Sequence, residues 1–348
     1  MAKRKKTGIW TSIVSRNVRA ASQLALRLGR TAAKRSAVRV AKPGPVARKA
    51  ASRSTSPAAG RWVVGAVAGT TGTRRWHLFI PAGLRARGAP ALLVMLHGCG
   101  QDGASFARST RMNAVAQREG FLVLYLEQDR LANPQGCWNW FDTRLGRAQG
   151  EADLVVAAVD QVIRRHRADG SRVAICGLSA GAGLAALVAL RHPERFSAVA
   201  MHSGVGPGAA HSSATALAAM RGRRRHVAWS TEFELPALLV IQGTADPIVV
   251  RSNARAAAHA WAHARTAHDA LPVRESAERR IQRGRRKPMR IVDFRRRQAL
   301  LATVVEIDGL GHAWSGGAAG EPFSDPAGPD ASRMIWAFAV RQFGASAS

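Results

Sequence analysis

Short runs of consecutive apolar residues recur along the chain from residue 75 onward, and a longer amphipathic segment separates most of them. Continuous apolar runs are typical of parallel strands that helices cover on both faces. We expect strands at residues 75–80, 91–96, 121–126, 172–176, 197–202, 237–242 and 301–307. Helical segments are expected near residues 105–119, 150–167, 181–191, 251–265 and 330–343. The alternation predicts an α/β fold with a mostly parallel central sheet and helices on both faces.

Two stretches do not follow this alternation. Residues 206–233 and 266–299 lack the expected pattern of strands and helices. We interpret both as insertions that leave the sheet and lie above it, where substrate loops are usually found.

The N-terminal part of the chain has a different pattern. Residues 9–28 place apolar side chains on one helical face and arginines on the other, which predicts a basic amphipathic helix. Residues 41–60 are rich in Pro, Ala and Ser and resemble a flexible linker. The predicted organisation is a basic, largely flexible tail over residues 1–60 and a folded domain over residues 61–348. No uninterrupted apolar stretch follows the basic start, so no ordinary signal peptide is expected and the cytoplasm is the predicted compartment.

Positive charge is concentrated rather than spread over the chain. The formal net charge is +30, and residues 1–60 contain 15 Lys and Arg and no Asp or Glu. Residues 221–225 and 265–297 contribute most of the rest. The folded body outside these segments is therefore close to neutral, and no apolar stretch is long enough to span a bilayer.

The most specific motif is Gly177-Leu178-Ser179-Ala180-Gly181, which has the form G-x-S-x-G. It lies between an expected strand and an expected helix, where a sharp turn would expose the hydroxyl of Ser179 at a helix N-terminus. Small residues around a serine also occur by chance at tight turns, but the strand-to-helix context favours a nucleophile. We expect Ser179 to be that nucleophile.

A serine nucleophile requires a base and an acid that orients the base. Asp246 follows the expected strand 237–242, and His312 follows the expected strand 301–307 between glycine-rich positions. The order Ser179, Asp246, His312 along the chain is the one found in hydrolases of this architecture. Asp308 is a rival for the acid, but it lies on the same loop as His312 and is poorly placed to support the imidazole from behind. Each residue alone would fit an ordinary turn; together they predict a catalytic triad.

An oxyanion hole should complete the site with two backbone amides. The amide of Ala180, next to the nucleophile, is one expected donor. The other should come from the loop after the strand 91–96; Cys99 is the favoured donor, and Gly98 or Gly100 remain alternatives. His97 is expected to brace this loop.

The chain contains three cysteines. Cys176 lies in an apolar strand and is expected to be an inert buried thiol. Cys99 and Cys137 both lie in loops near the expected site; they could pair if the protein is exported and would stay reduced in the cytosol, and the sequence leaves the two alternatives open.

Metal binding is not expected. His259 and His263 are four residues apart on an expected helix, but no acidic residue lies between them. The expected chemistry requires no metal and no cofactor.

Several sequence blocks resemble, in order, the poly(3-hydroxybutyrate) depolymerase family of esterases, which includes acetylxylan and feruloyl esterase relatives. The blocks run from about residue 76 to the end and include LHGCGQ at 96–101, EQDRLANPQGCWNWF at 127–141, GLSAGAG at 177–183, HSG at 202–204, GTADPIV at 243–249 and GLGHAWSGG at 309–317. The resemblance implies an α/β-hydrolase fold, the triad Ser179, Asp246 and His312, and oxyanion amides from Cys99 and Ala180. Family members include secreted proteins, which would place the chain outside the cell.

Three tryptophans are candidates for substrate contact. Trp138 and Trp140 belong to the CWNWF block, and Trp314 follows His312 closely. They either form an apolar wall for an acyl chain or close the core, and the two interpretations are equally favoured.

The sequence thus predicts a serine esterase that acts through an acyl-enzyme on 3-hydroxyalkanoate polyester or its oligomers. The near alternative is a general short-chain, feruloyl or acetylxylan esterase. A different class, a basic protein that binds nucleic acid or a surface through its tail, is less favoured because no nucleic-acid-binding fold accompanies the charge. The amphipathic helix suits an anionic membrane or the coated surface of a polymer granule.

Overall fold

The computed structural model describes residues 60–84, 88–224, 233–265 and 271–344. The chain divides into two units, Met1–Ser56 and Pro57–Ser348, and every described residue belongs to the second. The amphipathic helix expected at residues 9–28 therefore lies outside the described residues.

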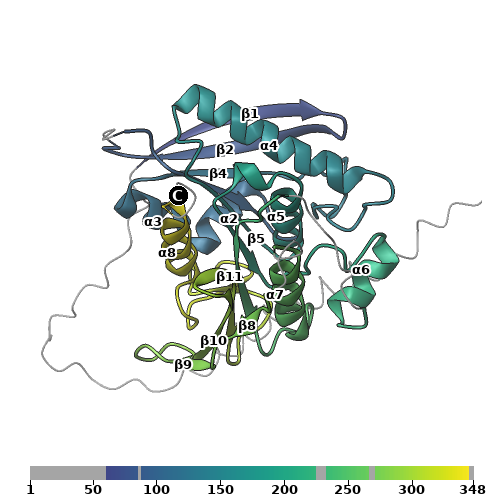
Figure 1. Cartoon of the computed structure of the whole chain (residues 1–348). Helices are drawn as coiled ribbons and strands as arrows, with labels where there is room; N and C mark the ends of the chain where they lie inside the picture. The colour runs from purple at the N-terminus through teal and green to yellow at the C-terminus, as the bar shows by residue number, and fades with distance from the viewer. Residues whose placement is uncertain (1–59, 85–87, 225–232, 266–270, 345–348) are drawn as a thin grey trace, which may run out of the picture. The chain divides into compact units, whose positions relative to one another are not determined.

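An eleven-stranded sheet forms the centre of the described unit (Figure 1). Its strands are β1 (Gly60–Gly69), β2 (Gly72–Pro81), β3 (Leu92–Leu96), β4 (Leu122–Leu126), β5 (Val173–Leu178), β6 (Ala198–His202), β7 (Ala237–Gly243), β8 (Arg274–Glu275), β9 (Arg279–Ile281), β10 (Met289–Arg296) and β11 (Ala299–Ile307). Their order is β1-β2-β4-β3-β5-β6-β7-β11-β10-β8, with β9 also paired to β10. The strands from β4 to β11 in this order are parallel, and those at both edges are antiparallel.

Helices cover both faces of this sheet. One core lies between the sheet and α4 (Arg147–His166), α5 (Ala180–Arg191) and α7 (Ser252–Arg265). The other lies between the sheet and α2 (Gly103–Thr110), α3 (Met112–Glu119) and α8 (Ala331–Phe343). Figure 1 shows the two groups on opposite sides of the central strands. The remaining elements are η1 (Pro193–Arg195), α6 (Ser213–Met220), β12 (Trp314–Ser315) and β13 (Ser324–Asp325).

The expected strands are confirmed. Their continuous apolar runs reflect burial on both faces of the sheet. Every residue of β3, β4, β5, β6 and β7 is buried, as continuous apolar runs require when helices cover both faces. The carboxyl ends of these parallel strands meet at one edge of the sheet, which is where ligand sites form in open α/β sheets.

The expected single helix over residues 105–119 is wrong. This stretch forms two helices, α2 and α3, because Arg111 between them adopts a left-handed conformation with φ 57°. The amide of Arg111 donates to the carbonyls of Ala107 and Arg108, which ends α2.

The expectation that residues 266–299 lie above the sheet is also wrong. β8, β9 and β10 lie within this stretch and extend the sheet at its edge, where β10 pairs antiparallel with β11. Arg290 and Asp293 interrupt the apolar positions of β10 and conceal the strand in the sequence. The edge strand β1 was likewise not expected, since most of its residues are at least partly exposed.

The described part of the other unusual stretch, residues 206–224, includes α6. The last residue of α6, Met220, is held at the start of α7: its carbonyl accepts from the amide of Val250, just before α7, at 2.9 Å and from the side chain of Asn253, in α7, at 3.1 Å. In Figure 1, α6 lies to one side of the central strands. Among the described residues no helix is both long enough and apolar enough to cross a membrane.

Candidate active site

Ser179 occupies the turn between β5 and α5. Its backbone has φ 56° and ψ −116°, a conformation that costs a residue with a side chain about 1–3 kcal/mol and persists only where the surroundings impose it. Here the serine amide donates to the carbonyl of His202 at 2.9 Å, and the serine carbonyl accepts from Ala182 and Gly183 at 3.0 and 3.1 Å. The turn is therefore fixed from both sides, and Ser179 remains partly exposed.

Two glycines allow this turn to close. A Cβ on Gly177 would collide with the backbone of Gly181, and a Cβ on Gly181 would collide with the carbonyl oxygen of Leu96 in β3. Because backbone occupies both spaces, neither position tolerates a side chain. The spacing of the G-x-S-x-G motif follows from this contact.

Asp246 and His312 are brought together by the loops after β7 and β11. His312 Nδ1 donates to Asp246 Oδ2 at 2.8 Å; the exposed fraction of the side chain is 9% for His312 and 0% for Asp246. Gln242 Nε2 donates to the same oxygen at 3.1 Å, and the amides of Ile248 and Val249 donate to Oδ1 at 2.9 Å each. The carboxylate is thus held on both oxygens, and one of them faces the imidazole.

These contacts keep the carboxylate ionised. Burial by itself would raise the pKa of Asp246, but the hydrogen bond and charge of His312 and the amides of Val249 and Ile248 outweigh burial and lower this pKa below its usual value. Asp246 is therefore an anion at neutral pH, and it holds the proton of His312 on Nδ1. The Nε2 atom of His312 is then the unprotonated nitrogen of the neutral ring.

Hydrogen bonds also join the two loops. The amide of Ala245 donates to the carbonyl of Leu310 at 3.0 Å, and the amide of Gly309 donates to Thr244 Oγ1 at 3.0 Å. The loops are so close that a Cβ on Gly243 would collide with the carbonyl oxygen of Leu310. The position of His312 is therefore set by the loop that carries Asp246.

Asp308, the rival acid, is engaged elsewhere. Its carboxylate accepts from Arg290 Nη2 at 2.9 Å and lies 3.8 Å from Arg280 Nη2. Both arginines come from the antiparallel edge strands. Among the described contacts, Asp308 makes none to His312, so the geometry favours Asp246 as the acid.

The two backbone amides expected to bind an oxyanion are those of Cys99 and Ala180. Within the described residues, the amides of Cys99 and Ala180 make no hydrogen bond. Their neighbours do: the amide of Gly98 donates to Gln101 Oε1 at 3.0 Å, and the amide of Gly100 donates to the carbonyl of Gln135 at 3.1 Å. This difference favours Cys99 over Gly98 and Gly100 as the donor from that loop.

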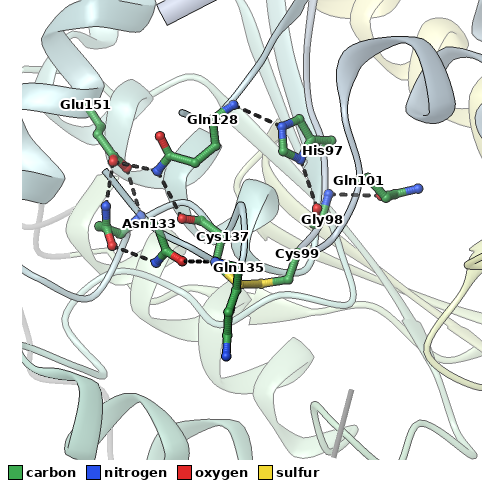
Figure 2. Close-up of a disulfide and its surroundings, with 10 residues drawn as sticks. His97, Gly98, Cys99, Gln101, Gln128, Asn133, Gln135, Cys137 and Glu151 are labelled. Carbon is green, nitrogen blue, oxygen red and sulfur yellow. Dashed lines mark hydrogen bonds between the residues drawn. A yellow bond between two sulfur atoms is a disulfide. The ribbon is translucent and has the colours of Figure 1, made fainter. Parts of the chain in front are cut away.

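The loop that carries Cys99 is bonded to a second loop. Cys99 and Cys137 form a disulfide, and Figure 2 shows it between the two loops. The sequence left open whether these two cysteines pair, and the structure has them paired. On the second loop the carbonyl of Cys137 accepts from Gln128 Nε2 at 2.9 Å.

A buried carboxylate anchors the second loop. Glu151, on α4, accepts hydrogen bonds from Gln128 Nε2 at 2.6 Å and from the side chain and amide of Asn139 at 2.7 and 2.8 Å (Figure 2). It also pairs with Arg74 at 3.1 Å, and both side chains are 1% exposed. The Cys99 loop is therefore tied through the disulfide to a network inside the protein.

His97 braces the same loop, as expected. Its Nε2 accepts from the amide of Gln128 at 3.1 Å, and its Nδ1 lies 2.8 Å from the carbonyl oxygen of Gly98. Burial lowers the pKa of His97, and hydrogen bonding to Gly98 only partly opposes this. The ring is therefore neutral, and it donates from Nδ1 to the loop.

The three tryptophans differ in position. Trp138 and Trp314 are fully buried, which favours the core for both; Trp314 Nε1 donates to Ser332 Oγ at 3.1 Å. Trp140 is 9% exposed and lies against the first turn of α5, where a Cβ on Gly183 would come within 3.0 Å of its ring. Trp140 is the remaining candidate for substrate contact.

No group of three or more His, Cys, Asp or Glu suited to a metal occurs in the described part of the chain. His259 Nε2 instead pairs with Glu275 at 2.9 Å. Two polar residues of the site were missed in the sequence, Gln242 and Glu151. Gln242 is the only polar side chain of the buried strand β7, and that isolation is the signal that would have singled it out. Glu151 has Gln149 and Asp153 as near neighbours, so the sequence carries no such signal for it.

The disulfide yields a first prediction. Cys137→Ala is expected to lower kcat about 10-fold with little change in KM, because it loosens the Cys99 amide without removing it. Removal of an oxyanion donor costs about 10²–10³ in kcat, and the other hydrogen bonds of the loop persist. Cys176→Ala, which alters the buried free thiol, serves as the control. Steady-state rates on p-nitrophenyl butyrate measure kcat and KM for each variant. An unchanged kcat in Cys137→Ala contradicts the proposal that the disulfide holds the Cys99 amide in place.

Comparison with known protein families gives a match over more than half of the chain. Residues 75–282 match the family model described as esterase PHB depolymerase. This range includes Ser179, Asp246, Cys99 and Ala180 and ends before His312.

Two curated relatives are similar over part of their length. The chain is 34% identical over 133 residues to feruloyl esterase B of Neurospora crassa, covering 38% of this chain and 44% of the relative. It is 37% identical over 126 residues to poly(3-hydroxyalkanoate) depolymerase C of Paucimonas lemoignei, covering 36% of this chain and 30% of the relative. The matches thus span less than half the length of these relatives.

Among solved structures, the acetyl xylan esterase of Aspergillus awamori superimposes with a TM-score of 0.57 at 18% sequence identity. The superposition covers 72% of this chain and 94% of that enzyme. At this identity the likeness establishes the fold, which is the α/β-hydrolase fold expected from the sequence.

Proposed function

Because the chain belongs to the esterase PHB depolymerase family, we propose that it hydrolyses carboxylic esters through an acyl-enzyme on Ser179. Two observations carry this proposal: the strained turn at Ser179, and a buried Asp246 that receives a 2.8 Å hydrogen bond from His312. A structural role for these residues would not require a serine in a left-handed conformation at a helix N-terminus.

In the first half of the reaction, Ser179 Oγ attacks the carbonyl carbon and gives its proton to His312 Nε2. The carbonyl oxygen becomes an oxyanion that the amides of Cys99 and Ala180 bind. The intermediate collapses, the ester C–O bond breaks, and the leaving alcohol takes the proton from His312. Asp246 holds the imidazole in the required tautomer and stabilises its positive charge.

In the second half, water attacks the acyl-enzyme and gives a proton to His312. The amides of Cys99 and Ala180 bind the new oxyanion as they bound the first. Collapse releases the carboxylic acid and returns the proton to Ser179. No step requires a group from outside the chain other than the ester and water.

We propose a 3-hydroxyalkanoate polyester or its oligomers as the substrate, with a short-chain, feruloyl or acetylxylan ester as the alternative. The similar poly(3-hydroxyalkanoate) depolymerase C supports the polyester, and the similar feruloyl esterase B supports the alternative. Trp140 is the candidate for contact with the acyl group, since it lies beside α5 and is not fully buried.

The experiment is a substrate panel with wild type and Ser179→Ala. It compares p-nitrophenyl esters of increasing chain length, amorphous polyhydroxybutyrate, methyl ferulate and acetylated xylan. Release of 3-hydroxybutyrate oligomers by the wild type alone supports the polyester proposal. Turnover of ferulate or acetylxylan without polyester hydrolysis contradicts it and leaves the esterase proposal standing.

The basic tail suggests a surface partner. We propose that residues 1–60, with 15 cations and the amphipathic pattern over residues 9–28, bind an anionic membrane or the coated surface of a polymer granule. Nucleic acid is the less favoured partner, and it would be bound through charge alone.

Removal of residues 1–56 is expected to leave kcat/KM for a soluble ester within about 2-fold, since every described residue of the site lies in the other unit. Binding to anionic vesicles should weaken, because cations near such a surface contribute about 1 kcal/mol each. Co-sedimentation with vesicles, granules and DNA at low and high salt measures this.

The apolar side chains of residues 9–28 should hold full-length protein on vesicles or granules at high salt, whereas counterion release should free it from DNA. A variant with Arg16, Arg19 and Arg27 changed to Gln tests the charge separately from the apolar face. Loss of soluble-ester hydrolysis on truncation contradicts the proposed boundary.

A further inference from the structure

His202 lies at the carboxyl end of β6, next to β5 and the Ser179 turn. It is fully buried, and the catalytic steps above do not use it. Its backbone carbonyl accepts the hydrogen bond from the amide of Ser179 at 2.9 Å. The residue after it, Ser203, donates its amide to the carbonyl of Ile241 in β7, the strand that leads to Asp246.

The side chain of His202 contacts the loop that follows His312. His202 Nε2 accepts from the amide of Ser315 at 3.1 Å, across 113 residues of sequence. The ring also stacks on the indole of Trp314, with centroids 5.0 Å apart and planes 22° apart. One residue therefore holds the nucleophile turn through its backbone and the histidine loop through its ring.

These contacts fix the tautomer of the imidazole. Since Nε2 accepts an N–H, the proton lies on Nδ1, which donates to Ser203 Oγ at 3.1 Å. Burial, the largest cause, and the charge of His312 together lower the pKa of His202 to about 3, although the charge of Asp246 opposes them. The ring remains a neutral hydrogen-bond acceptor at any pH at which an esterase is assayed.

We propose that His202 is a positioning residue for the reaction, which sets the placement of His312 relative to Ser179 through its acceptor bond to Ser315. This inference rests on the proposed function. The physical reason is that a displacement of about 1 Å between reacting groups can cost about 10²-fold in rate, so the two loops need a fixed link.

A pair of variants isolates the acceptor. In His202→Gln the side-chain oxygen reaches the position of Nε2 and can still accept from Ser315. In His202→Asn the side chain reaches only the position of Nδ1 and leaves the Ser315 amide without a partner. The two variants differ by one methylene group and are equally polar, so burial of a polar group affects both.

We expect His202→Gln to retain kcat on p-nitrophenyl butyrate within about 3-fold of wild type. His202→Asn should lose about 30-fold or more in kcat with KM within about 2-fold, because the link positions catalytic groups rather than binding the ester. Rates are expressed per site titrated with a fluorophosphonate, so that unfolded protein does not count. Equal kcat values in the two folded variants overturn the proposal.

A measurement on wild type covers the case in which either variant fails to fold. The imidazole nitrogen chemical shifts assigned to His202 should be those of a neutral ring protonated on Nδ1 throughout pH 5 to 8. A His202 ring that is protonated on Nε2, or that becomes charged within this range, overturns the proposal. Ser179→Ala separates the two levels of inference: activity in Ser179→Ala overturns the proposed function itself, whereas an inactive Ser179→Ala with equal Gln and Asn variants overturns only the role of His202.

Discussion

Ser179→Ala is expected to lower kcat for ester hydrolysis about 10⁴-fold or more and to leave the fold intact. The substitution removes only the hydroxyl that forms the acyl-enzyme, and the residues of such a triad act as a unit, so loss of one abolishes most of their joint effect. Alanine and serine tolerate the left-handed backbone of the turn equally poorly, so the change adds little strain.

Steady-state rates on p-nitrophenyl butyrate measure the loss, with circular dichroism and thermal unfolding as tests of the fold. Ser171→Ala is the matched control, because Ser171 precedes the opposite end of β5 and its hydroxyl contacts Asp169. A folded Ser179→Ala enzyme with kcat within about 10-fold of wild type contradicts the assignment of the nucleophile.

Asp246→Asn is expected to lower kcat by about 10⁴. The carboxylate accepts four hydrogen bonds, from His312, Gln242 and two backbone amides. Asparagine replaces one of the two carboxylate oxygens, which accept hydrogen bonds, by an NH₂ group, which only donates them. If its NH₂ faces His312, the imidazole must place its proton on Nε2, and the base is lost.

Asp308→Asn provides the comparison for Asp246→Asn. It should change kcat by no more than about 3-fold, since Asp308 binds Arg290 and Arg280 rather than the imidazole. Both variants are assayed on the same ester and checked for folding. A larger loss in Asp308→Asn than in Asp246→Asn reverses the identity of the acid.

The sequence predicted the parts of the fold whose pattern is local. The strands β3 to β7 are continuous apolar runs because both faces of the sheet are covered, and this requirement acts on every residue. The Ser179 motif was equally readable, since the collision of a Cβ on Gly177 with Gly181 restricts neighbouring positions in the chain.

The remaining features depend on contacts between distant residues. The break between α2 and α3 requires a left-handed Arg111, which no local glycine or proline announces. The sequence does not reveal β10, because Arg290 and Asp293 separate its apolar residues and its pairing with β11 is what makes it a strand. The disulfide between Cys99 and Cys137 could be named only as one alternative, because pairing depends on the fold that brings the two loops together.

The candidate site divides in the same way. Ser179, Asp246 and His312 were identified from their order and from the strands they follow. The choice of Asp246 over Asp308 gains support from the 2.8 Å bond to His312, which is a three-dimensional fact. His202 and Glu151 act through contacts to loops far along the sequence, so nothing near them in the chain reveals what they hold.

The central claim is that an acyl-enzyme forms on Ser179, and mass spectrometry of the trapped enzyme tests it most directly. Wild type is quenched in acid during turnover of p-nitrophenyl butyrate, and its peptides are mapped. A single butyryl adduct is expected on the peptide that contains Ser179, and it should be absent from Ser179→Ala. A fluorophosphonate should label the same residue with a 1:1 loss of activity. An adduct on another residue of the active enzyme, or full inhibition by the fluorophosphonate with Ser179 unmodified, contradicts the account.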